Sequence, residues 1–229
     1  MSTASPGRPG VGTAVPAEQT LRRPHVFVPG TGGRPLLLLH GTGADENDLL
    51  GLGRGLSPTS PLLSPRGTVL ESGMPRFFRR LAEGVFDEDD LRARTDELAS
   101  FLRTASVEYG LAVGSVVAVG FSNGANIASA LMMRHPGLLR GAVLFGAMVP
   151  FAGGPAAARD DGVPAELAGT RVLVVNGRRD PIVSAAQTDT VVAHLRSAGA
   201  EVTRLDHDGG HSVPAQLLPD IAAAVTALG

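Results

Sequence analysis

The chain has 229 residues, of which 43% are hydrophobic and 18% are charged. This length and composition fit one globular domain with a sizeable core. The formal net charge is −2 at pH 7, so the chain lacks the concentrated positive charge that binding to nucleic acid or to an anionic membrane surface requires. The sequence has no cysteine, which excludes disulfides, zinc–thiolate sites, iron–sulfur clusters and a cysteine nucleophile.

The N-terminal stretch, residues 1–20, is rich in Pro, Gly, Ser, Thr and Ala. We expect it to be a flexible arm that precedes one catalytic domain over residues 21–229. It has no apolar run long enough for the core of a signal peptide, and nowhere does the sequence approach the ~18 consecutive apolar residues of a membrane helix. We therefore expect a soluble, cytoplasmic protein with no membrane partner. Its oligomeric state stays open, with a homodimer as one option.

Short apolar runs alternate along the chain with longer segments of helical periodicity. Most of the runs are continuously apolar, which is typical of strands buried on both faces of a sheet. The predicted strands are Val26–Val28, Leu36–Leu39, Thr68–Leu70, Val116–Val119, Ala142–Phe145, Val172–Val175 and Val202–Leu205. The predicted helices are Asp45–Gly55, Glu88–Tyr109, Asn123–His135, Ser184–Ala198 and Val213–Leu228. The remaining segments, Leu56–Arg66 and Pro150–Thr170, are expected to be connectors.

This alternation predicts an α/β protein with a mostly parallel central sheet of about seven strands and helices on both faces. Sheets of this kind bind ligands at the carboxyl ends of their strands, so the functional residues should come directly after the apolar runs. Only the segments Leu56–Phe86 and Pro150–Thr170 could cover such a site. Neither is long enough to form a lid domain.

A candidate nucleophile follows the fourth predicted strand, in the stretch Gly120-Phe121-Ser122-Asn123-Gly124. A G-x-S-x-G pattern between a strand and a helix is the signature of the nucleophile elbow. The turn is so tight that the positions two residues before and two residues after the serine must lack a Cβ atom. Ser122 is therefore the candidate nucleophile. The alternative is a glycine-rich turn in which Ser122 only caps the helix.

A serine nucleophile needs a base and an acid, which in hydrolases with this elbow follow it in the order acid, then histidine. Asp180 and His211 both lie at predicted strand exits and have this order. His211 is favoured over His207 because two glycines precede it and would let the loop arch back over the serine. Asp180 is favoured over Asp206 and Asp208, which are too near His211 in sequence to orient it. An Asp-Pro turn is the structural alternative for Asp180.

A glycine-rich loop, His40-Gly41-Thr42-Gly43, follows the second predicted strand. The backbone N–H of Thr42 is the candidate donor for an oxyanion hole. The N–H of Asn123 is the second candidate, because it directly follows the serine at the start of a helix. His40 is interpreted as a hydrogen-bonded anchor of the loop. The loop matches neither a dinucleotide-binding fingerprint nor a Walker A motif.

Together these motifs resemble the phospholipase/carboxylesterase family of α/β-hydrolases, which includes the acyl-protein thioesterases. The resemblance runs from about Val26 to the C-terminus. It rests on His40-Gly41-Thr42-Gly43, Gly120-Phe121-Ser122-Asn123-Gly124-Ala125-Asn126-Ile127-Ala128, Ala147-Met148-Val149-Pro150, Asp180 and Gly209-Gly210-His211. It implies a single-domain α/β-hydrolase fold, with Ser122, Asp180 and His211 as nucleophile, acid and base and with Thr42 and Asn123 as oxyanion donors.

Within that family, two features look most like the bacterial carboxylesterase branch. One is Asn123, since the thioesterase branch usually has Gln after the nucleophile. The other is the stretch Gly73-Met74-Pro75-Arg76-Phe77-Phe78-Arg79-Arg80 with Phe86-Asp87. We therefore expect a serine carboxylesterase that hydrolyses small esters through an acyl-enzyme, with no cofactor and no metal. The alternative within the family is a lysophospholipase or an acyl thioesterase.

The substrate pocket is expected to draw on Phe77, Phe78 and Met148, for which ordinary core packing is the alternative interpretation. Two functions of other classes compete with the esterase. A non-catalytic binding protein of the same fold would normally lack a member of the triad, whereas all three candidates are present. A metal-dependent hydrolase would need a cluster of metal ligands. The candidate ligands are His40, Asp45, His207, Asp208 and His211. They lack the helical spacing of metalloprotease ligands.

Overall fold

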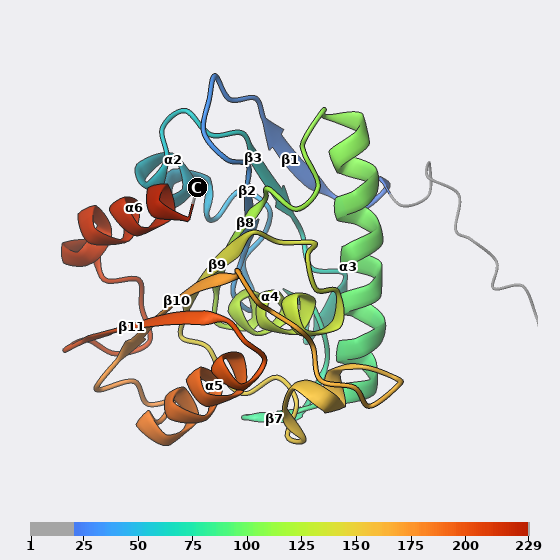
Figure 1. Ribbon diagram of the computed structural model, residues 1–229, viewed down its shortest axis with the longest axis vertical. Coiled ribbons are helices and arrows are strands. Elements are labelled where there is room, and N and C mark those ends of the chain that lie inside the picture. The colour runs from blue at the N-terminus through green and yellow to red at the C-terminus, as the bar shows by residue number, and fades with distance from the viewer. Residues whose placement is uncertain (1–20, 229) are drawn as a thin grey trace, which may run out of the picture.

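A seven-stranded sheet runs through the computed structural model, which describes residues 21–228 (Figure 1). The expected N-terminal arm, residues 1–20, lies outside the described residues. The order across the sheet is β1-β3-β2-β8-β9-β10-β11. Only β1 and β3 pair in antiparallel fashion, and the other neighbours are parallel. The strands are β1 His25–Val28, β2 Leu36–Leu39, β3 Leu62–Pro65, β8 Val117–Phe121, β9 Gly141–Phe145, β10 Arg171–Gly177 and β11 Glu201–His207.

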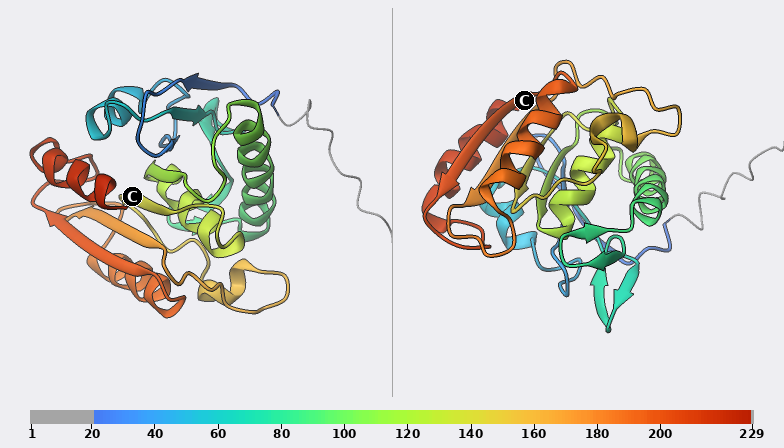
Figure 2. Two further views of the ribbon diagram at one scale, coloured as in Figure 1. Left: turned by 45° about the horizontal axis from the view of Figure 1, so that its top comes forward. Right: turned by 90° about the horizontal axis from the view of Figure 1, so that it is seen from below.

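Helices cover both faces of this sheet, as predicted. Helices α2 and α6 lie side by side against one face, and α3, α4 and α5 pack on the other (Figures 1 and 2). Between residues 21 and 228, none of the helices is both long and apolar enough to cross a membrane. The helices are α2 Leu50–Leu56, α3 Glu88–Glu108, α4 Asn123–Arg134, α5 Ala185–Ser197 and α6 Leu218–Ala227, with short 3₁₀ turns η1 Gly154–Ala158 and η2 Ala215–Leu217.

Strand β2 shows why the apolar runs are continuous. All four of its leucines are fully buried. Because side chains alternate along a strand, Leu36 and Leu38 join the core under α2 and α6, whereas Leu37 and Leu39 join the core under α3, α4 and α5. A central strand of a parallel sheet is apolar on both faces, so its sequence has no polar alternation.

One segment between α2 and α3 was predicted wrongly as a connector. Leu62–Pro65 is strand β3 of the main sheet, paired with β1 and β2. The run has only two apolar residues before Ser64 and Pro65, which is too short for a pattern to mark it. The segment is stabilised as a strand by pairing with two neighbouring strands, which its own sequence does not indicate.

The strand predicted at Thr68–Leu70 lies outside the main sheet. Val69–Glu71 (β4) pairs with Met74–Arg76 (β5) in a separate hairpin. A second hairpin pairs Arg80–Ala82 (β6) with Val85–Phe86 (β7). The two hairpins project from one end of the molecule in the right-hand view of Figure 2. Together they form the hairpin segment, residues 67–86.

Two helices begin later than predicted, each for a local reason. Helix α2 begins at Leu50 rather than at Asp45, because Asp45 Oδ1 accepts a hydrogen bond from Asn47 N (2.8 Å) and holds a turn there. Such Asx turns compete with helix formation. Helix α6 begins at Leu218 after the short 3₁₀ turn η2, and Pro219 lies in its first turn, where proline is tolerated.

Candidate active site

Ser122 lies at the sharp turn between β8 and α4. Its φ is +53°, in the left-handed region that residues with a Cβ rarely adopt. Backbone hydrogen bonds hold it there, since Ser122 N donates to Phe145 O (2.8 Å) and Asn126 N donates to Ser122 O (3.0 Å). The Ser122 side chain makes no capping hydrogen bond to the helix. Ser122 is thus the residue directly before α4, but its hydroxyl does not cap the helix.

The two glycines that flank Ser122 are required by close backbone contacts. A Cβ at Gly120 would lie 2.6 Å from Gly124 O. A Cβ at Gly124 would lie 1.9 Å from Leu39 O in the neighbouring strand. No side chain fits at either distance. The elbow thus brings the start of α4 against the end of β2, and this proximity sets Ser122 beside the glycine-rich loop that follows β2.

His211 and Asp180 are hydrogen-bonded to each other at the carboxyl ends of β11 and β10. His211 Nδ1 lies 2.7 Å from Asp180 Oδ2. The Asp180 side chain is only 1% exposed, and its Oδ1 accepts hydrogen bonds from Ile182 N (2.8 Å) and Val183 N (2.9 Å). Since Oδ1 is occupied, Oδ2 is left to receive the imidazole. His211 Nε2 is buried and has no hydrogen-bond partner among the described residues.

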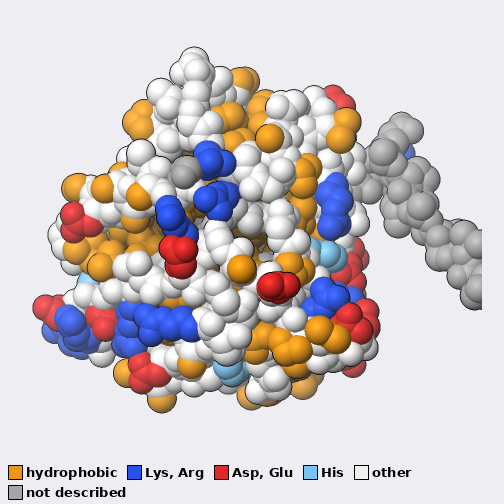
Figure 3. Space-filling view, viewed as in Figure 1, with side chains coloured by type: hydrophobic (Ala, Val, Ile, Leu, Met, Phe, Trp, Pro, Cys, Tyr) orange, Lys and Arg blue, Asp and Glu red, His pale blue; other side chains and the backbone are white. Residues whose placement is uncertain are grey.

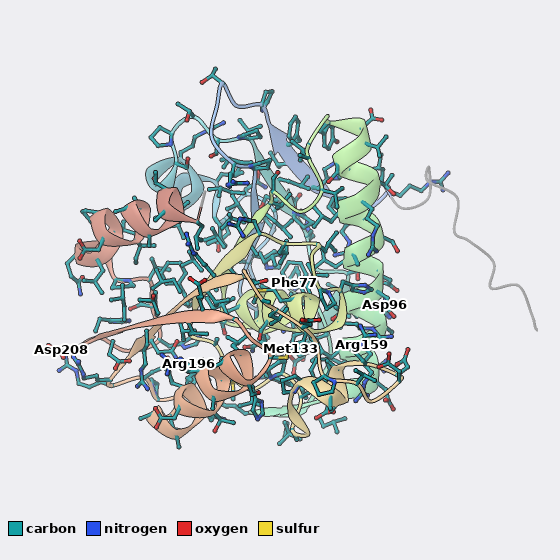
Figure 4. All side chains as sticks on the ribbon, in the orientation of Figure 1. Phe77, Asp96, Met133, Arg159, Arg196 and Asp208 are labelled. Atoms are coloured by element: carbon teal, nitrogen blue, oxygen red, sulfur yellow. The ribbon has the colours of Figure 1, made fainter. Side chains whose placement is uncertain are left out.

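The competing candidates are engaged elsewhere. His207 is buried, and its Nδ1 accepts a hydrogen bond from Gly209 N (3.1 Å). Asp206 pairs with Arg204 (2.8 Å). Asp208 is 84% exposed and lies at the outer edge of the molecule in Figure 4. Within residues 21–228, no three His, Asp or Glu side chains are placed to hold a metal ion, so the cluster considered from the sequence does not assemble.

His40 anchors the glycine-rich loop, as the sequence indicated. It is 1% exposed, and its Nε2 accepts a hydrogen bond from Gly67 N (2.9 Å). Because Nε2 accepts, the proton is on Nδ1, which donates to Gly41 O (2.7 Å). Burial lowers the pKa of His40 below its ordinary value, so the ring is neutral. The loop is thereby joined to the start of the hairpin segment.

The two candidate oxyanion donors are held by the same short stretch of chain. In the described part of the chain, neither Thr42 N nor Asn123 N donates to a protein acceptor. Arg76 Nη1 donates to Thr42 Oγ1 (3.0 Å), and Phe77 N donates to Asn123 Oδ1 (2.7 Å). Gly43 N donates to Pro75 O (2.9 Å). Residues 75–77 therefore orient both donors while leaving their N–H groups free.

A cavity of about 270 Å³ opens in front of these groups, slightly below the range of roughly 300–1,000 Å³ that is typical of small-molecule sites. Ser122, His211, Thr42 and Asn123 all line it. Its other walls are apolar at Phe86, Phe121, Met148 and Ile182, and polar or charged at Arg76, Arg80, Glu83 and Asn126. The hairpin segment supplies Phe86 and all three charged residues of these walls.

Of the three residues expected in the pocket, only Met148 lines the cavity. Phe77 and Phe78 are 1% and 0% exposed and belong to the core. The ring of Phe77 packs on His40 at 4.7 Å, and Figure 4 shows Phe77 in the interior beside α4. Phe78 contacts Phe86 edge to face at 5.0 Å. The expectation for these two rings was wrong because the hairpin turns Phe86 toward the cavity in their place.

Sequence reasoning also missed Arg76, Arg80 and Asn126 as cavity residues. Asn126 could have been found, because it stands three residues after Asn123 and so lies on the same side of the helix. No sequence pattern indicated the two arginines, since only the pairing of the hairpin strands turns them toward the cavity. Elsewhere the charged surface is mixed: in Figure 3 basic and acidic side chains are interspersed over the visible face.

Comparison with known sequences finds similarity to hydrolases and esterases. The sequence model of the family described as "Serine hydrolase (FSH1)" matches residues 86–219. The chain is 44% identical over 189 residues to "Putative hydrolase MhqD" of Bacillus subtilis (strain 168), covering 82% of this chain and 90% of that protein. It is 27% identical over 186 residues to "Esterase YpfH" of Escherichia coli (strain K12), covering 78% and 75%.

A solved structure has the same fold. The crystal structure of the Bacillus cereus carboxylesterase superposes with a TM-score of 0.86 at 41% identity. The match covers 93% of this chain and 97% of that one. The mostly parallel sheet with helices on both faces is therefore that of an α/β-hydrolase.

Proposed function

Because this chain belongs to the serine hydrolase family, we propose that it is a carboxylesterase in which Ser122, His211 and Asp180 form the catalytic triad. One observation carries the assignment. His211, which is hydrogen-bonded to Asp180, lines the same cavity as the elbow serine with its positive φ. A serine with positive φ, a buried imidazole nitrogen without a partner and a carboxylate behind that imidazole are the parts that nucleophilic ester cleavage needs.

In the first step, Ser122 Oγ attacks the carbonyl carbon of the ester while His211 Nε2 takes the hydroxyl proton. Asp180 Oδ2 accepts from His211 Nδ1–H, so the ring presents its basic nitrogen at Nε2 and its positive charge is stabilised. The tetrahedral oxyanion accepts hydrogen bonds from Thr42 N–H and Asn123 N–H. Asn123 also begins α4, whose dipole favours negative charge at that end.

In the second step, the C–O bond to the alcohol breaks and the imidazolium of His211 returns the proton to the leaving oxygen. Water then attacks the acyl group on Ser122 while His211 Nε2 takes a proton from that water. Collapse of the second tetrahedral intermediate releases the acid and restores the Ser122 hydroxyl. The same two N–H donors serve both intermediates, because the oxyanion forms at the same place each time.

The cavity volume supports small esters as substrates. About 270 Å³ accommodates a short acyl group and a compact alcohol but not a long chain. The segments that border the site form hairpins and the short turn η1 rather than a lid domain. We therefore expect simple saturation kinetics in solution, without activation at a lipid interface.

A series of p-nitrophenyl esters of increasing acyl length tests this function. We expect the highest kcat/KM at short acyl chains. Ser122→Ala should lower kcat on the order of a thousandfold or more, while Ser100→Ala, which removes an exposed serine of α3, should leave it unchanged. An optimum at long acyl chains would instead favour a lysophospholipase or an acyl thioesterase. Activity of Ser122→Ala within tenfold of wild type would overturn the serine mechanism.

A further inference from the structure

Two side chains in the cavity wall each have a nitrogen donor that makes no hydrogen bond to the described residues. Arg76 is 3% exposed. Its Nε donates to Phe78 O (3.2 Å) and its Nη1 to Thr42 Oγ1 (3.0 Å), but its Nη2 donates to none of the described residues. Because Arg76 lines the active-site cavity, this free N–H group can donate to an acceptor on a bound substrate.

Asn126 is the second such side chain. It is 3% exposed, and its Oδ1 accepts a hydrogen bond from Met148 N (2.7 Å). Because a backbone N–H can only donate, this contact fixes which side of the amide carries oxygen. The Nδ2 group is left without an acceptor among residues 21–228. Asn126 and Arg76 line the same cavity as Ser122.

The charges around the cavity are also incompletely balanced. Arg76 Nη1 and Arg80 Nε pair with the two oxygens of one carboxylate, Glu71, at 3.0 Å and 2.9 Å. The hydrogen bond from Arg80 lowers the pKa of Glu71, so that carboxylate is ionised. Two guanidinium groups against one carboxylate leave a net charge of +1. Glu83, the acidic residue of the cavity lining, is exposed to solvent, which weakens the effect of its charge without removing it.

We propose that Arg76, Arg80 and Asn126 form a carboxylate subsite, so that the preferred substrate is an ester carrying one free carboxylate. This inference rests on the proposed esterase function. A carboxylate offers two acceptor oxygens to the unpaired donors and one negative charge to the +1 cluster. The carboxylate belongs either to the acyl part, as in the monoester of a dicarboxylic acid, or to the alcohol part.

Two pairs of esters distinguish these sources. Monomethyl succinate against dimethyl succinate tests a carboxylate on the acyl side. 4-Acetoxybenzoate against its methyl ester tests one on the alcohol side. For each pair, the ratio of kcat/KM for the charged to the neutral ester is normalised by the hydroxide-catalysed rates. We expect a wild-type ratio of about tenfold in one pair, as charge-assisted hydrogen bonds would give.

Variants of the cluster identify the cause of that ratio. Arg80→Gln leaves Arg76 and Glu71 as a neutral pair, so the ratio should fall close to one. A general loss of activity does not change the ratio, because both esters are measured on the same variant. Arg79→Gln is the matched control: its side chain is 60% exposed, pairs with Asp87 and does not line the cavity, so the ratio should be unchanged. Glu83→Gln removes the exposed carboxylate of the cavity lining and should raise the ratio about two- to threefold.

The outcomes separate this inference from the function on which it rests. If the neutral esters are hydrolysed in a manner that depends on Ser122, but neither ratio exceeds one, the carboxylate subsite is wrong and the esterase stands. The same holds if a ratio above one survives Arg80→Gln. If wild type hydrolyses no ester of either pair and no p-nitrophenyl ester, the proposed function fails and the subsite fails with it.

Discussion

The β8–α4 elbow and the hairpin segment face the same cavity, but they are held in place by different forces. The elbow lies inside the core, and its backbone is fixed by contacts as close as that between Gly124 and Leu39. The hairpin segment exposes large apolar side chains, Leu70 at 70% and Leu81 at 73%. Its Phe77 and Phe78 are buried in the core, and hydrogen bonds from Gly67, Arg76 and Phe77 and from Gly43 N to Pro75 O join it to the site.

This difference separates reactivity from selectivity. The rigid part carries Ser122 and, at neighbouring strand ends, Asp180 and His211, which in the proposed mechanism must keep their geometry through the reaction. The hairpin segment carries Phe86, Arg76 and Arg80, which line the same cavity as Ser122. Changes in the rigid part should therefore abolish activity or folding. Changes in the hairpin segment should alter the choice of substrate or the pH dependence of stability by smaller amounts.

The largest expected effect is at His211. His211→Ala should lower kcat/KM on the order of a thousandfold or more, because Ser122 then has no base. His207→Ala should cost less than about tenfold, since His207 holds only a loop through Gly209 N. Steady-state kinetics on a p-nitrophenyl ester measure both. If His207→Ala were the severe variant, the base would have been assigned to the wrong histidine.

A steric test of the elbow comes next. Gly124→Ala should lower the free energy of unfolding by more than about 3 kcal/mol or prevent folding, because the new Cβ meets backbone that cannot move. Gly51→Ala is the control: a Cβ there has nothing within 4 Å, and alanine stabilises a helix by up to about 1 kcal/mol over glycine. Urea unfolding compares the two. Equal stabilities would mean that the close approach of α4 to β2 is not required.

The smallest expected effect is the pH dependence due to His40. Burial lowers the pKa of His40 below its ordinary value of 6.5. The unfolded chain therefore binds the proton first as the pH falls, and the free energy of unfolding decreases below about pH 6.5. One such group contributes a slope of at most about 1.4 kcal/mol per pH unit. Protonation would also remove the acceptor for Gly67 N and loosen the hairpin segment.

The comparison variant is His40→Gln, which retains a carbonyl acceptor and does not titrate. Between pH 6.5 and about pH 5, above the range of ordinary carboxylates, its unfolding free energy should vary less with pH than that of wild type. A residual slope is expected, because burial also lowers the pKa of His135. Identical slopes for the two proteins would show that His40 does not control this pH dependence.

The sequence predicted the rigid part well, because that part follows backbone rules. Glycines two residues to either side of Ser122 and the Leu36–Leu39 run each have a direct steric or packing cause. Gly209 and Gly210 before His211 likewise led to the histidine that the structure pairs with Asp180. The strand count was close for the same reason, although the position of one strand was wrong.

The hairpin segment could not be predicted in the same way. Its four strands have two or three residues each, too few for a period to be recognised. Whether Phe77 or Phe86 faces the cavity depends on hairpin register, and a shift of one residue exchanges the two faces of a strand. The orientation of Arg76 and Arg80 depends on that register too, and on their pairing with Glu71. No local sequence pattern indicates that pairing.

The central claim, that Ser122 is the nucleophile of this cavity, is tested most directly by a fluorophosphonate probe. Attack by Ser122 Oγ on phosphorus expels fluoride and leaves a stable phosphonyl ester. Peptide mapping of the labelled protein by mass spectrometry should place one adduct on Ser122, Ser122→Ala should take up none, and Ser100→Ala should label like wild type. Labelling on another residue, or equal labelling of Ser122→Ala, would contradict the account.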